Sequence, residues 1–431
     1  MHFLCKYFLG LLLGLASSMS LAMAQPAQLT DILNEADAQN PSLRVQQEQI
    51  EMASSQIKQV TSLQDPIISV SLLNYPVNSF ATNRTPMTSN EIRLAQMFPF
   101  PGKLDAKGRV AAKKSLWFAA AYQDTRLQLR RQVKDAWYRL LFQRQAIQLT
   151  QRNLKIFDDF IKLTEARYEV GKGLQQNVLK AHLQRSRQLD KLLVLQQQEE
   201  ATVAELNSLV GRKTDQPLEI NDQLQSFDKS FKLNELQEQA TQKRPMFKAY
   251  SALIDQYKAQ RQLARLDYHP DFTLWAGYRW RDDSLVDGGD DFISTGISFN
   301  LPVRKERRAA SVAAADSALR LAFKKRNSFL NQVDLEIHRS LTSFEQAGKL
   351  ADLYQNGIIP QANQTFQATL SAYQVDQVDF LDLLDSLLTL YRYEIDFIKA
   401  LSDQQRSMAR LEAAAGLEID RLPEQSTPFK G

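Results

Sequence analysis

The chain has 431 residues, of which 24% are charged and 44% hydrophobic, and its formal net charge is +4. This near balance of charge excludes the strongly basic composition that is typical of a nucleic-acid-binding protein. Its single cysteine, Cys5, lies close to the N-terminus, so the rest of the chain can form neither a disulfide nor a thiolate metal site.

The first residues follow the pattern of an export signal. Lys6 is followed by an apolar run over residues 7–15 and by small residues that end at Ala24. We expect a secretory signal peptide that is cleaved after Ala24. The apolar run is too short to span a bilayer, and no later stretch reaches the length of about 18 apolar residues that a transmembrane helix needs. The exported chain could therefore enter a membrane only as a β-barrel.

Landmarks of the first half recur in the second half in the same order and at a nearly constant spacing. The matched pairs are Pro41 with Pro245, Pro66 with Pro270, Pro101 with Pro302, Tyr168 with Tyr373, and Gly211 with Gly416. This regularity predicts an internal two-fold repeat. The predicted divisions are a signal peptide (1–24), a first repeat (25–215), a linker (216–230), a second repeat (231–417) and a C-terminal tail (418–431).

Each predicted repeat begins with a helix and continues into a pair of strands. The four predicted strands are 67–74, 91–98, 272–281 and 292–299. Apolar and polar residues alternate along them, as in Ile68, Val70 and Leu72 against Ser69 and Ser71. Alternation with the apolar side chains outside is typical of a membrane barrel. A half-buried soluble sheet shows the same pattern, so the strands alone leave both interpretations open.

The segment FPFPGK, residues 98–103, joins the second predicted strand to a long helix. Proline lacks a backbone N–H and fixes φ, so Pro99 and Pro101 should end the strand ladder and prepare a helix start at Gly102. Pro302 is expected to do the same in the second repeat. Four strands are too few for a membrane barrel, which needs about eight, whereas three chains would supply twelve.

Long helices should carry most of the mass, over 102–170 and 174–210 in the first repeat and over 303–373 and 377–416 in the second. Apolar residues recur every seven positions, which predicts left-handed coiled-coil packing. The two stripes are Val133, Leu140, Ile147, Leu154, Ile161 and Tyr168, and Ile337, Phe344, Ala351, Ile358, Thr365 and Ala372. Pro360 predicts a kink in the second long helix. The predicted fold is mainly α with a small β part, in which a trimer builds a 12-stranded barrel and an α-helical tunnel.

The duplicated plan, FPFPGK, and the segments ARYEVGKGLQQNVLKA and IIPQANQTFQATLSAYQVDQVDFLDLLDS resemble the TolC-type outer membrane efflux proteins. The resemblance covers essentially the whole exported chain, and FPFPGKL is similar to members that work with heavy-metal pumps. It implies a homotrimer that crosses the outer membrane and extends through the periplasm to an adaptor (membrane fusion) protein. An inner-membrane pump of the resistance-nodulation-division type would drive small solutes, such as heavy-metal cations or drugs, through this passive conduit, without a cofactor.

The resemblance also implies roles for two groups of residues. The turns at the far ends of the long helices would contact the adaptor through Tyr168, Val170, Gly171, Leu174, Tyr373 and Val375. Asp376 replaces the glycine that the family usually has in the second turn, which leaves the fit of that turn open. Asp376, Asp379, Asp382 and Asp385 recur every three residues along one helical side and are the candidates for the periplasmic gate and for cation selection. By resemblance, Asp382 and Asp385 match the acidic positions that line the closed entrance in the family. An exposed acidic helix face remains the alternative for these four.

Other functions have weaker support in the sequence. There is no GxSxG, HExxH or phosphate-loop motif that would indicate an enzyme. His182, His269 and His338 lie far apart, so no metal-ligand cluster is expected. A channel for type I protein secretion and a periplasmic coiled-coil adaptor remain alternatives, although an adaptor would not explain the doubled strand pairs.

Overall fold

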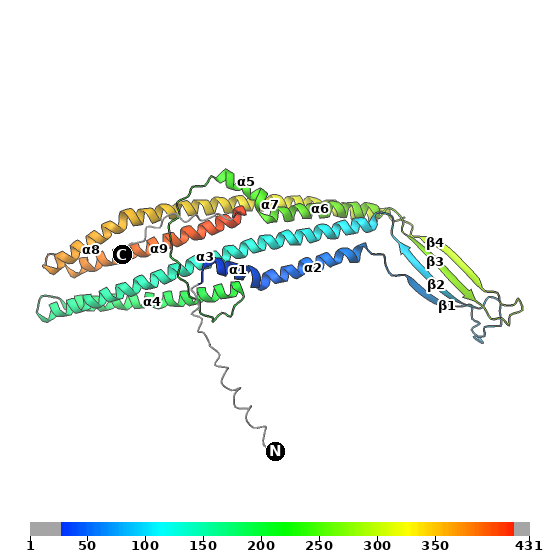
Figure 1. The fold of residues 1–431 in the computed structure, drawn as a ribbon, viewed down its shortest axis with the longest axis horizontal. Coiled ribbons are helices and arrows are strands. Elements are labelled where there is room, and N and C mark those ends of the chain that lie inside the picture. Colours follow the sequence, from blue (N-terminus) through cyan, green and yellow to red (C-terminus); the bar gives the residue numbers. More distant parts are fainter. Residues whose placement is uncertain (1–26, 418–431) are drawn as a thin grey trace, which may run out of the picture.

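The computed structural model describes residues 27–417, so the predicted signal peptide and the C-terminal tail lie outside the described residues. The described part is elongated, with a small sheet at one end and the turns between long helices at the other (Figure 1). The first half contains α1 (Leu29–Gln39), α2 (Pro41–Thr61), β1 (Ile67–Leu73), β2 (Ser89–Phe98), α3 (Lys103–Glu169) and α4 (Gln175–Val210). The second half contains α5 (Leu233–Lys243), α6 (Pro245–Leu266), β3 (Phe272–Trp280), β4 (Phe292–Phe299), α7 (Lys305–Leu353), the π-helix η1 (Tyr354–Ile358), α8 (Ile359–Gln374) and α9 (Phe380–Ala415).

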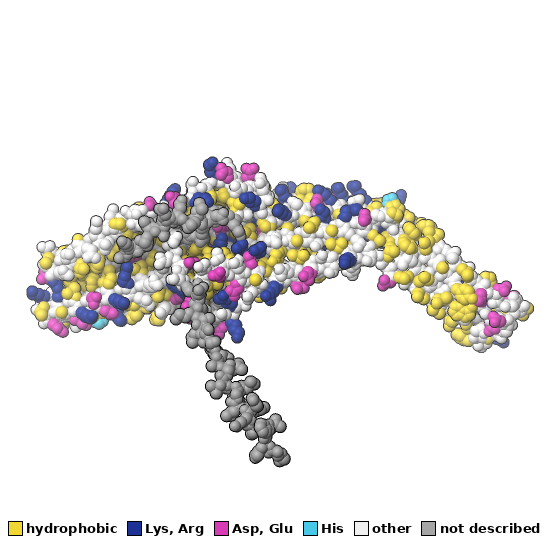
Figure 2. Space-filling model, in the orientation of Figure 1, with side chains coloured by type: hydrophobic (Ala, Val, Ile, Leu, Met, Phe, Trp, Pro, Cys, Tyr) yellow, Lys and Arg dark blue, Asp and Glu magenta, His cyan; other side chains and the backbone are white. Residues whose placement is uncertain are grey.

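The sheet is antiparallel, and its strands lie in the order β1-β2-β3-β4. The prediction of a mainly helical chain with a small β part is therefore confirmed. One face of the sheet carries large apolar side chains that are more than 60% exposed, including Ile68, Val70 and Ile293. Figure 2 shows hydrophobic side chains gathered over this end of the molecule. An exposed apolar area of this kind marks a surface that contacts another protein or a membrane.

The long helices form two antiparallel hairpins, one from α3 and α4 and the other from α7, α8 and α9 (Figure 1). The hairpins pack against each other through α3 and α9, while α2 and α6 pack along the sheet-proximal part of α3. The largest buried cluster surrounds Trp137 of α3 and includes side chains from α1, α4 and α9. Within residues 27–417, no helix has an apolar stretch long enough to cross a membrane.

The seven-residue stripe of the second half differs from the prediction beyond η1. Ile337, Phe344 and Ala351 are buried as expected, but Thr365 is exposed and the buried positions shift by one residue to Phe366 and Tyr373. A π-helix accommodates an extra residue per turn, so η1 resets the phase of the stripe. The chain is helical on both sides of Pro360, and the π-helix η1 lies directly before this residue. Proline and π-helices are both common causes of a kink, so both features occur at the position where the kink was predicted.

The same extra residue is visible in the spacing of the matched landmarks. The stripe positions Ile147 and Ala351, directly before η1, are 204 residues apart, whereas Tyr168 and Tyr373, after it, are 205 apart. The π-helix therefore lies where the second half has gained one residue relative to the first.

A charged contact fixes α3 against α9 near the middle of the molecule. Asp135 of α3 accepts two hydrogen bonds of 3.1 Å from Arg406 and one of 3.0 Å from Arg410. Burial by itself would raise the pKa of the Asp135 carboxyl, but the hydrogen bonds and charges of the two arginines outweigh it and hold the pKa below its ordinary value.

We expect Asp135→Asn to lower the free energy of unfolding by about 1.5–3 kcal/mol at neutral pH, the range for hydrogen bonds to charged groups. Because the folded pKa is depressed, the ionised carboxylate stabilises the fold fully above its unfolded pKa of about 3.9. That contribution disappears as the pH falls through the folded pKa. Chemical denaturation of the detergent-solubilised wild type and variant at pH 7 and in strong acid measures the difference.

Asp105→Asn is the matched control, because the Asp105 side chain is 81% exposed and pairs only with Arg109 on its own helix. This control should change the unfolding free energy by less than about 0.5 kcal/mol. An equal loss for Asp135→Asn at both pH values would show that its charge does not stabilise the contact.

Candidate functional site

The end of the molecule away from the sheet carries two tight turns, which we call the tips. The first tip is residues 169–175, between α3 and α4, and the second is residues 374–380, between α8 and α9. In the first, Gly171 N–H donates to the Tyr168 carbonyl and Lys172 N–H to the Arg167 carbonyl, at 3.0 and 2.8 Å. In the second, Asp376 N–H donates to the Tyr373 carbonyl and Gln377 N–H to the Ala372 carbonyl, at 3.2 and 2.9 Å. The two tips thus have the same backbone hydrogen-bond pattern.

Asp376 adopts the left-handed backbone conformation that glycine provides in the first tip. Its φ is 64°, against 72° for Gly171. This region of backbone space disfavours residues with a Cβ, but aspartate and asparagine tolerate it better than most. The replacement of glycine by aspartate therefore preserves the turn and adds a carboxylate at its apex.

That carboxylate joins the two tips of one chain. The Arg167 guanidinium, at the end of α3, lies 2.6 Å from an Asp376 carboxylate oxygen. It also stacks over the Tyr373 ring, at 4.4 Å from the centroid, and donates to the Gln374 carbonyl at 3.3 Å. The Arg167 side chain is only 16% exposed, so it is held in this position by both the charge and the ring.

The predicted tip residues divide into exposed and buried groups. The side chains of Tyr168, Val170, Leu174 and Val375 are 48–69% exposed and Gly171 is also exposed, as a contact surface requires. Tyr373 is 4% exposed and packs against Phe380, with a ring separation of 6.0 Å. Within this chain Tyr373 therefore supports the turn from inside and does not belong to the exposed surface.

The four predicted acidic residues lie along the second tip and the start of α9, and all are exposed. Asp379 precedes α9, and its side chain accepts a hydrogen bond from the Phe380 N–H, at 2.6 Å. Asp382 is in the first turn of the helix, where a negative charge is favourable. Asp382 and Asp385 follow at a spacing that keeps both on the solvent side, while Leu383 and Leu384 are buried.

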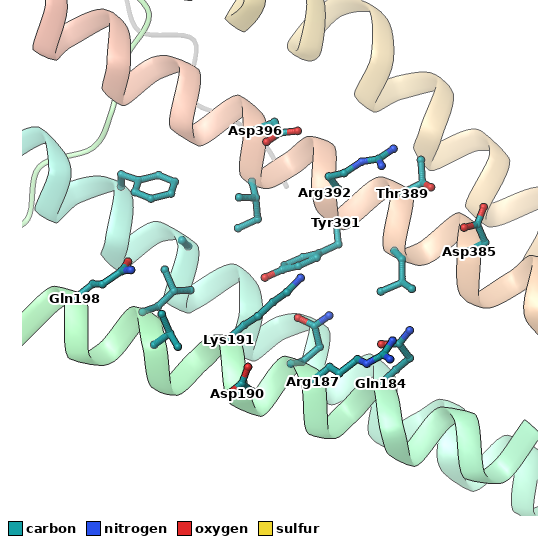
Figure 3. Close-up of a pocket in the computed structure, with 17 residues that line it drawn as sticks. Gln184, Arg187, Asp190, Lys191, Gln198, Asp385, Thr389, Tyr391, Arg392 and Asp396 are labelled. Carbon is teal, nitrogen blue, oxygen red and sulfur yellow. The ribbon is translucent and has the colours of Figure 1, made fainter.

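Asp385 lies at the edge of a groove of about 660 Å³ between α4 and α9. Figure 3 shows that Arg187 and Lys191 of α4 lie along this groove and that Tyr391 of α9 points into it toward Lys191. Lys191 lies 5.3 Å from the centre of the Tyr391 ring, and the Tyr391 hydroxyl is 2.9 Å from the Thr150 hydroxyl. Asp385 thus shares the lining of this groove with basic side chains from the other hairpin.

At the sheet end, the joint between β2 and α3 is a β-turn. Lys103 N–H donates to the Phe100 carbonyl at 3.0 Å, and Gly102 has φ 87° and ψ −10°. With proline second and glycine third, this is a type II turn. Pro99 and Pro101 therefore lie before the helix and not in its first turn as expected.

This first joint is tied to the second half of the chain. The buried Lys103 ammonium lies 2.8 Å from the Asp271 carboxylate, which also accepts the Phe100 N–H at 2.8 Å. Pro302 does not reproduce the arrangement. Val303 N–H donates to the Leu301 carbonyl and Lys305 N–H to the Val303 carbonyl, two consecutive γ-turns, and α7 begins only at Lys305. The two joints thus differ in geometry.

Sequence reasoning missed the basic partners of these sites. Arg167 directly precedes the predicted tip residue Tyr168, and a basic residue in the last turn of a helix was the available signal. Arg187 and Lys191 carry no motif, and they share a groove with Asp385 only because α4 and α9 line its two sides. Within residues 27–417, no group of three or more histidine, cysteine, aspartate or glutamate side chains could hold a metal ion.

Comparison with known proteins places these features in context. The family model described as outer membrane efflux protein matches residues 32–212 and 236–417. The cobalt-zinc-cadmium resistance protein CzcC of Cupriavidus metallidurans is 21% identical over 318 residues, which are 73% of this chain and 74% of that protein.

Two solved structures illustrate the likeness of fold. The outer-membrane channel OprN superposes with a TM-score of 0.77 at 16% identity, over 90% of this chain and 89% of that one. The outer membrane protein VceC of Vibrio cholerae superposes with a TM-score of 0.75 at 20% identity, over 91% and 97% of the two chains. At such identities the structures show the fold alone.

We expect Arg167→Ala to loosen the second tip. An ion pair and a cation–π contact of this kind each stabilise by up to about 1 kcal/mol, so amide hydrogen exchange over residues 372–378 should accelerate about fivefold. Mass spectrometry of the exchanging protein measures this rate, and Lys162→Ala, which removes an exposed charge from the same helix, is the control. Unchanged exchange at the second tip would mean that Arg167 does not hold the two tips together.

Proposed function

The chain belongs to the outer membrane efflux protein family, and on this premise we propose that it forms the outer-membrane channel of a tripartite efflux system. The observation that carries the proposal is the combination of an open four-stranded sheet with one apolar face and helices that run away from it. With 67 residues, α3 alone is about 100 Å long at 1.5 Å per residue. Such a molecule can cross a membrane with its sheet and bridge a periplasm with its helices.

The open sheet supports a trimer. Strands β1 and β4 each pair on one side only in the described part of the chain. Backbone groups cannot stay unpaired in lipid, so a membrane sheet must close into a barrel. Three chains would supply twelve strands, with β4 of one chain beside β1 of the next. The strands contain 7 to 10 residues, close to the 9–11 that a tilted membrane strand needs.

The helices also have surfaces that fit another copy. Leucines on α4 are more than half exposed in the single chain: Leu179, Leu183 and Leu193. Side chains at such positions in a long helix normally pack against a neighbouring helix. In the proposed trimer, α4 lies next to the α7–α9 hairpin of the adjacent chain, and twelve long helices form a tunnel. The proposed structural repeats are residues 25–215 and 231–417, joined by a linker at 216–230.

The proposed protein partners are an adaptor and a pump, which would join the channel at its tips. The exposed tip residues would contact a periplasmic adaptor, and the adaptor would join the channel to an inner-membrane pump of the resistance-nodulation-division type. The likeness to the cobalt-zinc-cadmium resistance protein supports heavy-metal ions as cargo. They would pass through the conduit as substrate, driven by the pump. The acidic stripe from Asp376 to Asp385 would line the closed periplasmic entrance.

Chemical cross-linking in native membranes should give a ladder of products that ends at three chains. Leu183→Asp with Leu193→Asp should strongly reduce the trimer, because it places two charges in the proposed helix interface. Gln196→Asp, an exposed polar position on the same helix, should leave the trimer yield close to that of the wild type. A ladder that ends at one or two chains would contradict the assembly.

The purified channel should be cation-selective at its periplasmic entrance. Replacing Asp382 and Asp385 by asparagine removes six carboxylates from the proposed trimer, which should lower cation selectivity and abolish block by divalent or trivalent cations. Conductance in planar lipid bilayers measures both properties, and Asp159→Asn, an exposed acid on α3, is the control. If the double variant keeps both properties, these aspartates do not line the entrance.

A further inference from the structure

A charged cluster lies in the middle of the sheet, far from the acidic tips. Glu91 of β2 is 4% exposed and lies between two arginines. Arg93 Nη2 is 2.7 Å from one Glu91 carboxylate oxygen, and Arg279 Nη2 of β3 is 3.0 Å from the other. One carboxylate is therefore shared by two guanidinium groups.

Packing holds this cluster in place. The Arg93 guanidinium stacks over Trp275, at 4.1 Å from the ring centroid. Trp275 in turn lies across Gly296 of β4, where a Cβ atom would come within 2.6 Å of the indole ring. Only glycine at this position allows the tryptophan to lie against the sheet. Arg93 is thus held by a carboxylate and by an aromatic ring.

The cluster contains every charged residue of the four strands. The strand register pairs Ser69 with Arg93, Glu91 with Arg279, and Trp275 with Gly296, so the cluster shares one face of the sheet with serines and glycines. The other face carries the exposed apolar side chains. With two arginines and one glutamate, the polar face has a net charge of +1 per chain.

The charges are not equally accessible. The side chains of Arg93 and Arg279 are 40% and 38% exposed, whereas the Glu91 side chain is 5% exposed. Each guanidinium has five N–H donors and uses only part of them on Glu91. A solute on this face therefore meets free cationic donors, while the carboxylate stays covered.

We propose that Glu91, Arg93 and Arg279 form an anion-binding site inside the barrel. The inference rests on the proposed function, because the polar face becomes the wall of the lumen only when three chains close the barrel. The trimer then carries a ring of net charge +3 at the level of these residues. Guanidinium groups bind carboxylate and phosphate oxygens with paired hydrogen bonds, so the ligands are small inorganic anions and solutes that bear such groups. Glu91 aligns the two arginines and does not contact the ligand.

The two ends of the conduit would then prefer opposite charges, with acidic rings at the periplasmic entrance and a basic ring in the barrel. A polyvalent anion that enters from the extracellular side should reach the basic ring first and block the current. Inorganic tripolyphosphate is a suitable probe, because its charge is high and it carries no apolar group.

The test uses the full-length channel in planar bilayers, in an Asp382→Asn, Asp385→Asn background so that the entrance does not dominate the current. We expect Arg93→Gln with Arg279→Gln to raise the half-blocking concentration of tripolyphosphate at least tenfold and to shift the reversal potential in a potassium chloride gradient toward cations. Glu91→Gln removes a negative charge, so it should lower the half-blocking concentration and shift the reversal potential toward anions. Lys232→Gln, an 81% exposed position at the start of α5, should change neither.

The double variant Arg93→Lys, Arg279→Lys keeps both positive charges, so it separates the loss of charge from a failure to fold or assemble. This lysine variant should retain the block by tripolyphosphate that the Arg93→Gln, Arg279→Gln variant loses. Both variants should migrate as trimers. If the glutamine variant does not assemble, Arg279→Gln alone should give a smaller shift in the same direction.

The outcomes separate the two proposals. A conducting channel whose block and reversal potential do not respond to the arginine or glutamate substitutions would overturn the anion site and leave the channel intact. The absence of any conductance from the trimer would overturn the channel, and the anion site with it.

Discussion

Strands β1 and β4 each leave one backbone edge without a partner in the described part of the chain, and most other features of the molecule follow from this. A sheet with one apolar face and two open edges is stable neither in water, where the apolar face is exposed, nor alone in lipid, where the edges are unpaired. Closure with further copies of the same chain satisfies both faces and both edges. In the proposed barrel, the apolar face would contact lipid and the polar face a water-filled lumen.

The long helices connect the sheet to the tips and keep the two halves of the chain packed together along this length. The type II turn at Phe100–Lys103 and the Lys103–Asp271 ion pair link both halves of the chain where the sheet ends. Beyond it, the α3–α4 and α7–α9 hairpins keep their packing through a seven-residue stripe. The π-helix η1 absorbs one additional residue, so that Phe366 and Tyr373 still enter the core near the second tip. Arg167 then fastens the first tip to the second.

Local patterns were sufficient to predict the strands, the long helices and the end of the strand ladder at FPFPGK, because alternation, heptad spacing and proline each act over a few residues. Features that depend on contacts between distant segments were not predictable. The burial of Tyr373 and the one-residue shift of the stripe follow from the π-helix, which has no sequence signature. The Glu91 cluster depends on the register between β2 and β3, which sets Arg279 opposite Glu91. The sequence left open the geometry of the turn at Asp376; aspartate tolerates a positive φ, and the turn is preserved.

In the proposed barrel, one face of the sheet contacts lipid and the other contacts water. Spin labels on single cysteines at adjacent positions of β4, Ile293→Cys and Ser294→Cys, test it directly in membranes, since these side chains lie on opposite faces. The label at 293 should be accessible to oxygen dissolved in the bilayer and protected from a water-soluble nickel reagent. The label at 294 should show the reverse. Equal accessibility at both positions, or the opposite pattern, would show that the apolar face does not contact lipid while the polar face contacts water.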